Sequence, residues 1–234
     1  MRLIVTAARV AAHTGCSIFR DVGQVESRSF AASGFDEVRV GGSDTVKIVR
    51  GPTAGVVARG PAKLLDSLEI RTEGRKLRVG RTSSMGMGWA TNQDVVITVT
   101  LPAIHAAERA GSGDVNIDRA DGAEFGANLS GSGTLNIAVI AAASTKLGLR
   151  GSGTIKARGQ TGALSADLVG SGDLKAEDLQ ADSAAIAVKG SGSARASARK
   201  SASLTLTGSG DATIKGTREC AIMSRGSGNA RCTG

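Results

Sequence analysis

Aromatic side chains are nearly absent from this sequence of 234 residues, which holds four Phe, one Trp and no Tyr. Proteins that bind single-stranded nucleic acid stack the bases on aromatic rings. The shortage therefore argues against a nucleic-acid partner, despite a net charge of +8. Histidine is also rare, with only His13 and His105. Because the cysteines show no zinc-ligand spacing either, we expect no metal site, no cofactor and no catalytic centre.

The sequence also lacks an apolar stretch of the roughly 18 residues that a transmembrane helix requires. Met1 and Arg2, followed by apolar residues 3–8, resemble the start of a signal peptide. Residues 14–17 resemble the end of a lipoprotein signal, in which Cys16 would be acylated. Residues 1–27 are thus predicted to be a signal or lipoprotein-like segment, or else a disordered tail. We expect export to the periplasm, outer membrane or surface of a bacterium, with membrane contact only through a lipid on Cys16.

Glycine is abundant, with 33 residues, and it is arranged periodically. The tripeptide Gly-Ser-Gly occurs seven times, with successive spacings of 20, 20, 19, 20, 18 and 18 residues. Its first glycines are Gly111, Gly131, Gly151, Gly170, Gly190, Gly208 and Gly226. A flexible Gly/Ser linker would not keep such a period, and each tripeptide here is flanked by apolar residues. A repeat of this length indicates a solenoid or another repeat architecture.

Apolar and polar residues alternate on both sides of each tripeptide. In the second repeat, Leu135 and Ile137 follow Gly131 with the polar Asn136 between them, and Ala127 and Leu129 precede it. This period-two pattern is typical of half-buried strands. Glycine at a corner permits a positive φ or a close backbone approach. Stacked coils would pair each strand with the equivalent strand of the next coil, about 4.8 Å away.

Residues 111–234 are therefore predicted to form an all-β, right-handed parallel β-solenoid with coils of about 18–20 residues and Gly-Ser-Gly corners. The alternative is an antiparallel sandwich or barrel with Gly-Ser-Gly in hairpin loops. Residues 28–110 lack the tripeptide but alternate like strands, for example from Val95 to Leu101, and residues 61–66 suit one helical turn. This β-rich N-terminal part either begins the same solenoid or caps it, which would protect an open strand edge.

Three segments resemble a known family. They are Phe30 with residues 34–40 (Gly-Phe-Asp-Glu-Val-Arg-Val), residues 95–102 (Val-Val-Ile-Thr-Val-Thr-Leu-Pro), and Gly-Ser-Gly-Asp-Val at 111–115 with its later copies. Together they are similar to the putative auto-transporter adhesin, head GIN domain family, over about residues 28–232. The resemblance implies a β-helix-like fold, export to the bacterial envelope, often as a lipoprotein, and an adhesin or surface-binding role without a catalytic motif.

Basic residues recur at fixed places in the repeat. Lys156, Lys175, Arg195 and Arg231 occupy one outward position, and Arg150, Lys189 and Arg225 occupy another, directly before the corner. A regular row of cations suits an extended polyanion such as an acidic polysaccharide or lipopolysaccharide phosphate, bound in a salt-sensitive manner. The alternative is an ordinary solvated face that discourages edge pairing.

Cys220 and Cys232 both fall at inward positions of the last coil. In an oxidising compartment they would form a disulfide that holds this coil, and otherwise they are two small buried thiols. Asp114, Asp173 and Asp211 follow Gly-Ser-Gly, where Asp commonly bonds nearby backbone N–H groups; calcium binding is the weaker alternative.

These patterns favour a non-catalytic, adhesin-like envelope module that binds polysaccharide or another polyanion. Two other functions stay open. A carbohydrate-active enzyme could use the acidic cluster of Asp167, Asp173, Glu177, Asp178 and Asp182, because paired carboxylates hydrolyse glycosides. A structural protein could instead self-associate by end-to-end stacking.

Overall fold

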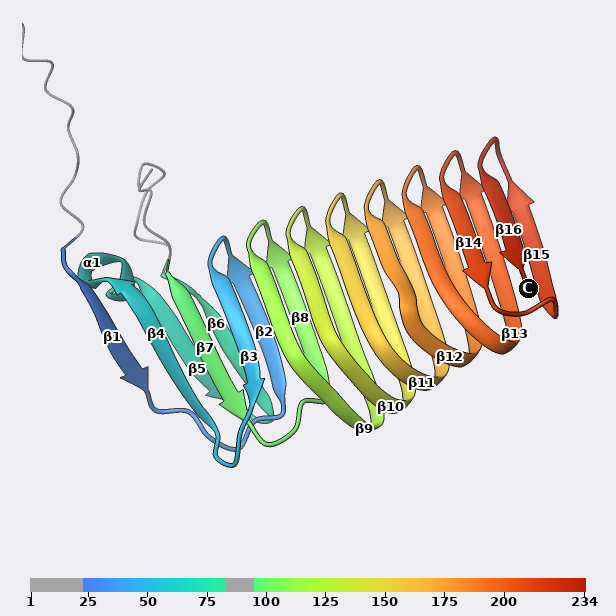
Figure 1. The fold of residues 1–234 in the computed structure, drawn as a ribbon. Helices are drawn as coiled ribbons and strands as arrows, with labels where there is room; N and C mark the ends of the chain where they lie inside the picture. Colours follow the sequence, from blue (N-terminus) through green and yellow to red (C-terminus); the bar gives the residue numbers. More distant parts are fainter. Residues whose placement is uncertain (1–22, 83–94) are drawn as a thin grey trace, which may run out of the picture.

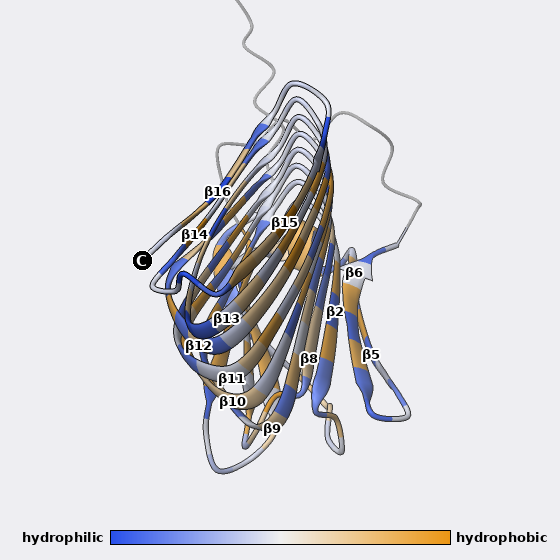
Figure 2. Ribbon diagram, turned by 90° about the vertical axis from the view of Figure 1, so that its right-hand side faces the viewer, coloured by the Kyte–Doolittle hydropathy of each residue, from blue (hydrophilic) through white to orange (hydrophobic). Residues whose placement is uncertain are grey.

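The Gly-Ser-Gly tripeptides lie one above another along one edge of the molecule, where each turns the chain from one sheet face to the other (Figures 1 and 2). The computed structural model describes residues 23–82 and 95–234; Cys16 lies outside these ranges. The repeat region consists of β9 (Asp114–Gly131), β10 (Thr134–Gly151), β11 (Thr154–Gly170), β12 (Asp173–Gly190), β13 (Ser193–Gly208), β14 (Asp211–Lys215), β15 (Cys220–Arg225) and β16 (Asn229–Thr233).

Each long strand descends one face from its corner, passes round a wide bend and climbs the other face to the next corner (Figure 2). In Figure 1 the chain descends on the near side, returns on the far side and advances toward the C-terminus, so the coil is right-handed. The predicted solenoid is confirmed, since β9 to β13 pair in parallel with equivalent residues opposite each other, for example Leu135 opposite Ile155. Antiparallel hairpins at the Gly-Ser-Gly corners are therefore ruled out.

Both glycines of each corner are required, for different reasons. The first glycine has φ between 116° and 128°, a region that L side chains rarely adopt. A Cβ atom on Gly151 would also lie 2.6 Å from the carbonyl oxygen of Gly131 in the coil below, and one on Gly153 would lie 2.5 Å from that of Gly133. The backbones can stack this closely only because neither position carries a side chain.

The bend, by contrast, absorbs differences in coil length. The strands β9 to β13 stay in β conformation through the bend and reach 16 to 18 residues. The register is unbroken between the equally long coils of β9 and β10. It shifts at the bend between β10 and β11 and again between β12 and β13, where the spacing changes. Such bulges add or remove a residue without disturbing the corners.

The core is a thin layer of inward side chains between the two faces. The predicted inward positions are buried; Leu147, Ile186 and Leu204 are each at most 3% exposed. Ile222 holds the same position in the last coil but is 46% exposed, because no further coil stacks on it.

The solenoid begins earlier than the repeat spacing indicates. β2 (Glu37–Gly42) and β3 (Thr45–Arg50) form a first coil whose corner, Gly42-Ser43-Asp44, stacks against that of Gly111. β8 (Ala106–Gly111) lies beside β2, and β3 lies beside the start of β9. Thus one part of residues 28–110 continues the solenoid.

The remaining N-terminal elements cap the solenoid (Figure 1). They are β1 (Val25–Phe30), β4 (Gly55–Pro61), α1 (Ala62–Leu65), β5 (Leu68–Glu73), β6 (Lys76–Arg81) and β7 (Val96–Leu101). β7, β4 and β1 extend one face, and β6 and β5 extend the other, with antiparallel pairing at the outer edges. The expected helical turn is α1, with Leu64 and Leu65 buried. Within the described ranges no helix is long and apolar enough to cross a membrane.

Buried charges join the cap to the first coil. Asp44 stands where the later corners have their second glycine, and its carboxylate pairs with the guanidinium of Arg81, which also donates to the carbonyl oxygen of Leu64. Arg109 occupies a position that is Leu or Val in β9 to β13 and Ser224 in the last coil, and it is 1% exposed. Its guanidinium donates to backbone carbonyls, including those of Gly42 at 2.6 Å and Gly113 at 2.9 Å. Burial lowers the pKa of Arg109.

Candidate functional site

The first face comprises β1, β4, β7, β3, β14, β16 and the starts of β9 to β13. Here parallel pairing places Lys156 beside Lys175, and Lys175 beside Arg195. We call these three residues the basic ladder. Their neighbours along the strand, such as Ile155 and Leu174, are buried, so the alternation of a strand directs the three side chains away from the core.

No acid is paired directly with a cation of the basic ladder, although Asp173 and Glu177 lie two residues from Lys175 on the same strand and face. None of its three cations forms an ion pair or a side-chain hydrogen bond with any residue in the described ranges. Like charges directly opposite each other in a sheet destabilise it. The basic ladder therefore lowers the stability of the fold. Because folding does not explain it, the basic ladder is a candidate binding surface.

Uncharged polar residues continue the row in both directions. Asn136 follows Lys156 toward the cap and donates its amide N–H to the side chain of Asn116. In the other direction Thr213 follows Arg195, and then comes Arg231, whose guanidinium donates to the Thr213 hydroxyl at 3.3 Å.

The other predicted basic residues lie on the opposite side of the molecule. Arg150, Lys189 and Arg225 directly precede a corner, on the second face, which comprises β2, β5, β6, β8, β15 and the ends of β9 to β13. They are also not adjacent, because Val169 separates Arg150 from Lys189 and Thr207 separates Lys189 from Arg225. The seven cations thus form two surfaces separated by the core.

The second face carries a shallow hollow of about 380 Å³ that crosses β10 to β13. Small residues line it, and its outward positions include Ser144, Ala163, Ser183 and Ser201. Sequence reasoning missed this hollow, although the outward run of Ser and Ala one coil apart was a signal for it.

The predicted acidic cluster is dispersed. Asp182 pairs with Arg199 and with Lys200, and these two cations lower the pKa of its carboxyl. Asp178 lies 3.4 Å from the guanidinium of Arg158. Asp167 lies on the second face, whereas Asp173 follows a corner on the first. These acidic residues therefore do not line a single groove in which two carboxylates face each other.

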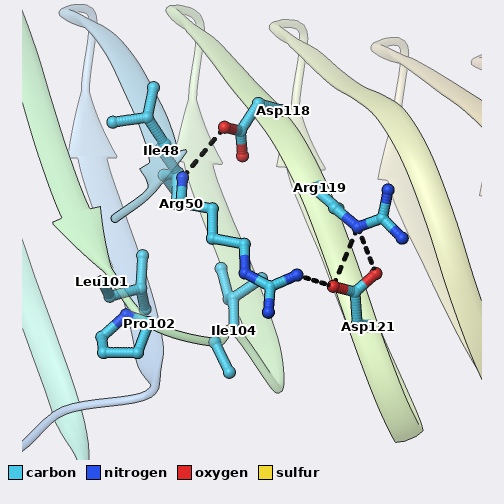
Figure 3. Close-up of a pocket in the computed structure, with 10 residues that line it drawn as sticks. Ile48, Arg50, Leu101, Pro102, Ile104, Asp118, Arg119 and Asp121 are labelled. Carbon is cyan, nitrogen blue, oxygen red and sulfur yellow. Dashed lines mark hydrogen bonds and ion pairs between the residues drawn. The ribbon is translucent and has the colours of Figure 1, made fainter. Parts of the chain in front are cut away.

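A second group of acids lies where the first coil meets the cap (Figure 3). Asp118 accepts a hydrogen bond from the backbone N–H of Arg50 at 2.9 Å, and Asp121 pairs with the guanidinium groups of Arg50 and Arg119. The cavity between them and Leu101 holds only about 10 Å³, which is room for one water molecule. This site is too small for a sugar ring, and its charges bind the bend to β3.

Two of the three Asp residues after Gly-Ser-Gly, Asp114 and Asp211, act as caps between coils. The carboxylate of Asp114 accepts a hydrogen bond from the backbone N–H of Thr134 at 3.1 Å, and that of Asp211 accepts one from Asn229 at 3.3 Å. Across the described residues, no group of three or more His, Cys, Asp or Glu side chains has the geometry to hold a metal ion.

In the last coil Cys220 and Cys232 form a disulfide across the open end of the core. Cys220 lies at the start of β15 and Cys232 near the end of β16, so the bond joins the two faces. Both cysteines pack against the hydrophobic core.

The family model for the putative auto-transporter adhesin, head GIN domain matches residues 34–218, which include the first coil, the cap from β4 onward and most of the repeats. The chain belongs to this family. Membership supports an adhesin-like role at the surface or in the envelope of a bacterium. Among curated proteins, none matches the chain.

Solved structures share the fold of this head GIN domain protein. A putative adhesin from Bacteroides fragilis superposes with a TM-score of 0.83 at 18% identity, covering 89% of this chain and 97% of that chain. A putative lipid binding protein from Parabacteroides distasonis gives 0.70 at 23% identity, covering 89% and 97%. A putative adhesin from Parabacteroides merdae gives 0.70 at 16% identity, covering 90% and 96%. At these identities the likeness establishes the fold alone.

Proposed function

We propose that the protein is a non-catalytic, adhesin-like binding module whose basic ladder holds an extended polyanion, such as an acidic polysaccharide or the phosphates of lipopolysaccharide. The supporting observation is that Lys156, Lys175 and Arg195 lie on adjacent strands without acid partners. Strand spacing sets the cations about 4.8 Å apart, so a flexible polymer can meet all three at once.

The flanking residues support a polymer more than a compact anion. Asn116, Asn136 and Thr213 extend the row with neutral hydrogen-bonding groups, and Arg231 adds a further cation beyond Thr213. A repeating ligand could continue along these positions. As in other exposed charge pairs, each contact would contribute modestly and would be screened by salt.

Location follows from the same proposal. We place the protein in the bacterial envelope or at its surface, with Cys16 as a candidate lipid anchor. Labelling cells with a palmitate analogue, followed by purification of the protein, tests this anchor; label that persists in a Cys16→Ser variant would contradict it.

The test of polyanion binding compares two triple variants with the same change in net charge. Replacing Lys156, Lys175 and Arg195 with Gln removes the basic ladder, whereas the matched control replaces Arg150, Lys189 and Arg225 with Gln on the second face. Retention is measured on immobilised lipopolysaccharide and on heparin over a salt gradient. We expect the ladder variant to lose about tenfold or more in affinity, and the control to lose less than about twofold.

Three results would contradict this function. Equal losses in the two variants would mean that binding follows net charge alone. Retention that does not weaken with salt would exclude an electrostatic ladder. Release of shortened glycan fragments, detected by mass spectrometry, would instead show an enzyme.

A further inference from the structure

The two ends of the solenoid are finished differently. At the N-terminal end the antiparallel strands of the cap extend both faces, and α1 joins β4 on one face to β5 on the other (Figure 1); the outermost strands β1 and β5 each pair with one neighbour in the described residues. At the other end β15 pairs only with β13 and β16 pairs only with β14, so both strands have a free side in the structure as described. Free strand edges are templates for another strand, and solenoids ordinarily cover them.

The backbone hydrogen bonds that β15 and β16 form identify which of their N–H and C=O groups remain unpaired. Ala202 donates its N–H to the carbonyl of Glu219, and Asn229 donates to that of Gly210. Bonding alternates along a strand, so Ala221, Met223 and Arg225 face β13, and Arg231 faces β14. The N–H and C=O groups of Ile222 and Ser224 on β15, and of Ala230 and Cys232 on β16, therefore point to the free side.

The side chains at this edge are apolar and cationic. Ile222 and Met223 are 46% and 59% exposed, although Ile222 occupies a core position. Arg218, Arg225 and Arg231 surround the edge and are exposed, and none has an acid partner within the described ranges. Glu219 is the only acid beyond Asp211, whose carboxylate already accepts a bond from Asn229.

We infer that β15 accepts an additional strand from an acidic, extended segment of a partner protein. Main-chain pairing to Ile222 and Ser224 would supply the contact, apolar side chains of the segment would cover Ile222, and its carboxylates would meet Arg225 at the end of β15 and Arg218 just before its start. Strand addition of this kind is a known mode of peptide recognition. A second copy of this chain fits less well, because it would bring the same arginines against this edge. The inference does not depend on the basic ladder.

The probe is a fluorescein-labelled peptide of nine alternating Glu and Val residues with blocked ends, and binding is followed by fluorescence anisotropy. Ser224→Pro removes an outward N–H, which proline permits at a strand edge, and Ser224→Ala is the matched control. We expect Ser224→Pro to weaken binding about tenfold, with no change for Ser224→Ala and a smaller loss for the Gln triple variant of the basic ladder. A peptide with N-methyl groups on alternate residues keeps the charge but should not bind.

A second variant guards against misfolding of the proline variant. Arg218→Glu combined with Arg225→Glu should lose the Glu-Val peptide and gain a Lys-Val peptide of the same length. The inference is wrong if the Glu-Val peptide fails to bind, if the N-methylated peptide binds as well, or if the ladder variant alone abolishes binding. It is also wrong if light scattering shows a dimer that Ser224→Pro converts to a monomer, since a second copy would then occupy the edge.

Discussion

The cap and the repeats use charge in opposite ways. On the cap, cations are paired with acids: Arg75 binds Asp36, Lys76 lies 2.7 Å from Glu108, and Arg78 lies 3.1 Å from Glu73. The Arg75 guanidinium, with His105 close by, lowers the pKa of the Asp36 carboxyl. In the repeats, the basic ladder and the arginines around β15 have no such partners.

Their backbones also differ. The cap contains antiparallel pairs, one helix and large buried side chains such as Leu65, Leu77 and Ile97. The repeats rely on identical corners and smaller residues, including Ala157, Ala176 and Ala196, each at most 1% exposed. Specific side-chain pairs stabilise the cap, whereas the repeats are stabilised by the pairing of equivalent residues in successive coils. Charged side chains that do not contribute to this pairing are available for binding.

The largest loss of stability is expected at a corner glycine, where the coils can stack only because the residue has no side chain. Gly151→Ala should destabilise the protein by about 4 kcal/mol, because alanine is strained at φ 116° and its Cβ would meet the Gly131 carbonyl. Gly80→Ala is the control in the cap, where φ is not positive and nothing lies within 4 Å of the added carbon. Urea unfolding measures both, and equal costs would contradict the role assigned to the corners.

The next effect tests whether a Gly-Ser-Gly corner can replace the Gly42-Ser43-Asp44 corner of the first coil. Asp44→Gly makes the first corner Gly-Ser-Gly, yet it should destabilise the protein by about 3 kcal/mol, because Arg81 loses its buried partner. Adding Arg81→Leu should recover most of this loss. A single variant as stable as the parent protein in thermal unfolding would show that the ion pair is not needed.

A smaller effect is expected at the open end. Cys220→Ser should favour opening of the last coil by about 2 kcal/mol, since the disulfide closes a loop between residues 12 apart in sequence. Hydrogen exchange of the β15 and β16 amides should accelerate, while amides of β10 and β11 keep their protection. Cys232→Ser should behave identically; acceleration throughout the protein would mean that the coils do not open independently.

The smallest effect separates the two uses of charge. Replacing Lys156, Lys175 and Arg195 with Gln should change the free energy of unfolding by at most about 0.5 kcal/mol, and toward greater stability, because like charges are removed. Replacing Arg75 and Lys76 with Gln should instead lower it, because Asp36 and Glu108 lose their cationic partners. Calorimetry at low salt measures both, and a destabilised ladder variant would contradict the absence of acid partners.

The repeats were predictable because their chemistry is local. Glycine at a fixed period marks a corner, and alternation around it, as at Leu135 and Ile137, marks the inward face. The first coil was only one of two alternatives predicted for residues 28–110, for two reasons. Its corner has Asp44 in place of a glycine, and residues 51–105 separate it from the coil on which it stacks. The remaining signal was alternation on both sides of Gly42, at Val38, Val40, Val46 and Ile48.

The sequence predicted which basic residues share a position in the repeat, but it did not predict on which face of the solenoid each position lies. The spacing correctly made neighbours of Lys156, Lys175 and Arg195, because parallel register copies the sequence period into space. It assigned Arg150 to a second position of the repeat but did not place that position on the opposite face, because the face depends on where the chain reverses relative to each side chain. The free edge at β15 was also beyond the sequence, since a strand pattern does not state how many neighbours the strand has.

Because each coil meets its neighbours in the same way, the protein can change length in whole units. Duplicating or deleting about 20 residues from one corner to the next would lengthen or shorten the rod by about 4.8 Å and leave every remaining contact as it was. Every outward row would gain or lose one member in the same step. Relatives could thus evolve different reach and different valency for a polymer through simple recombination between Gly-Ser-Gly codons, without any redesign of the core.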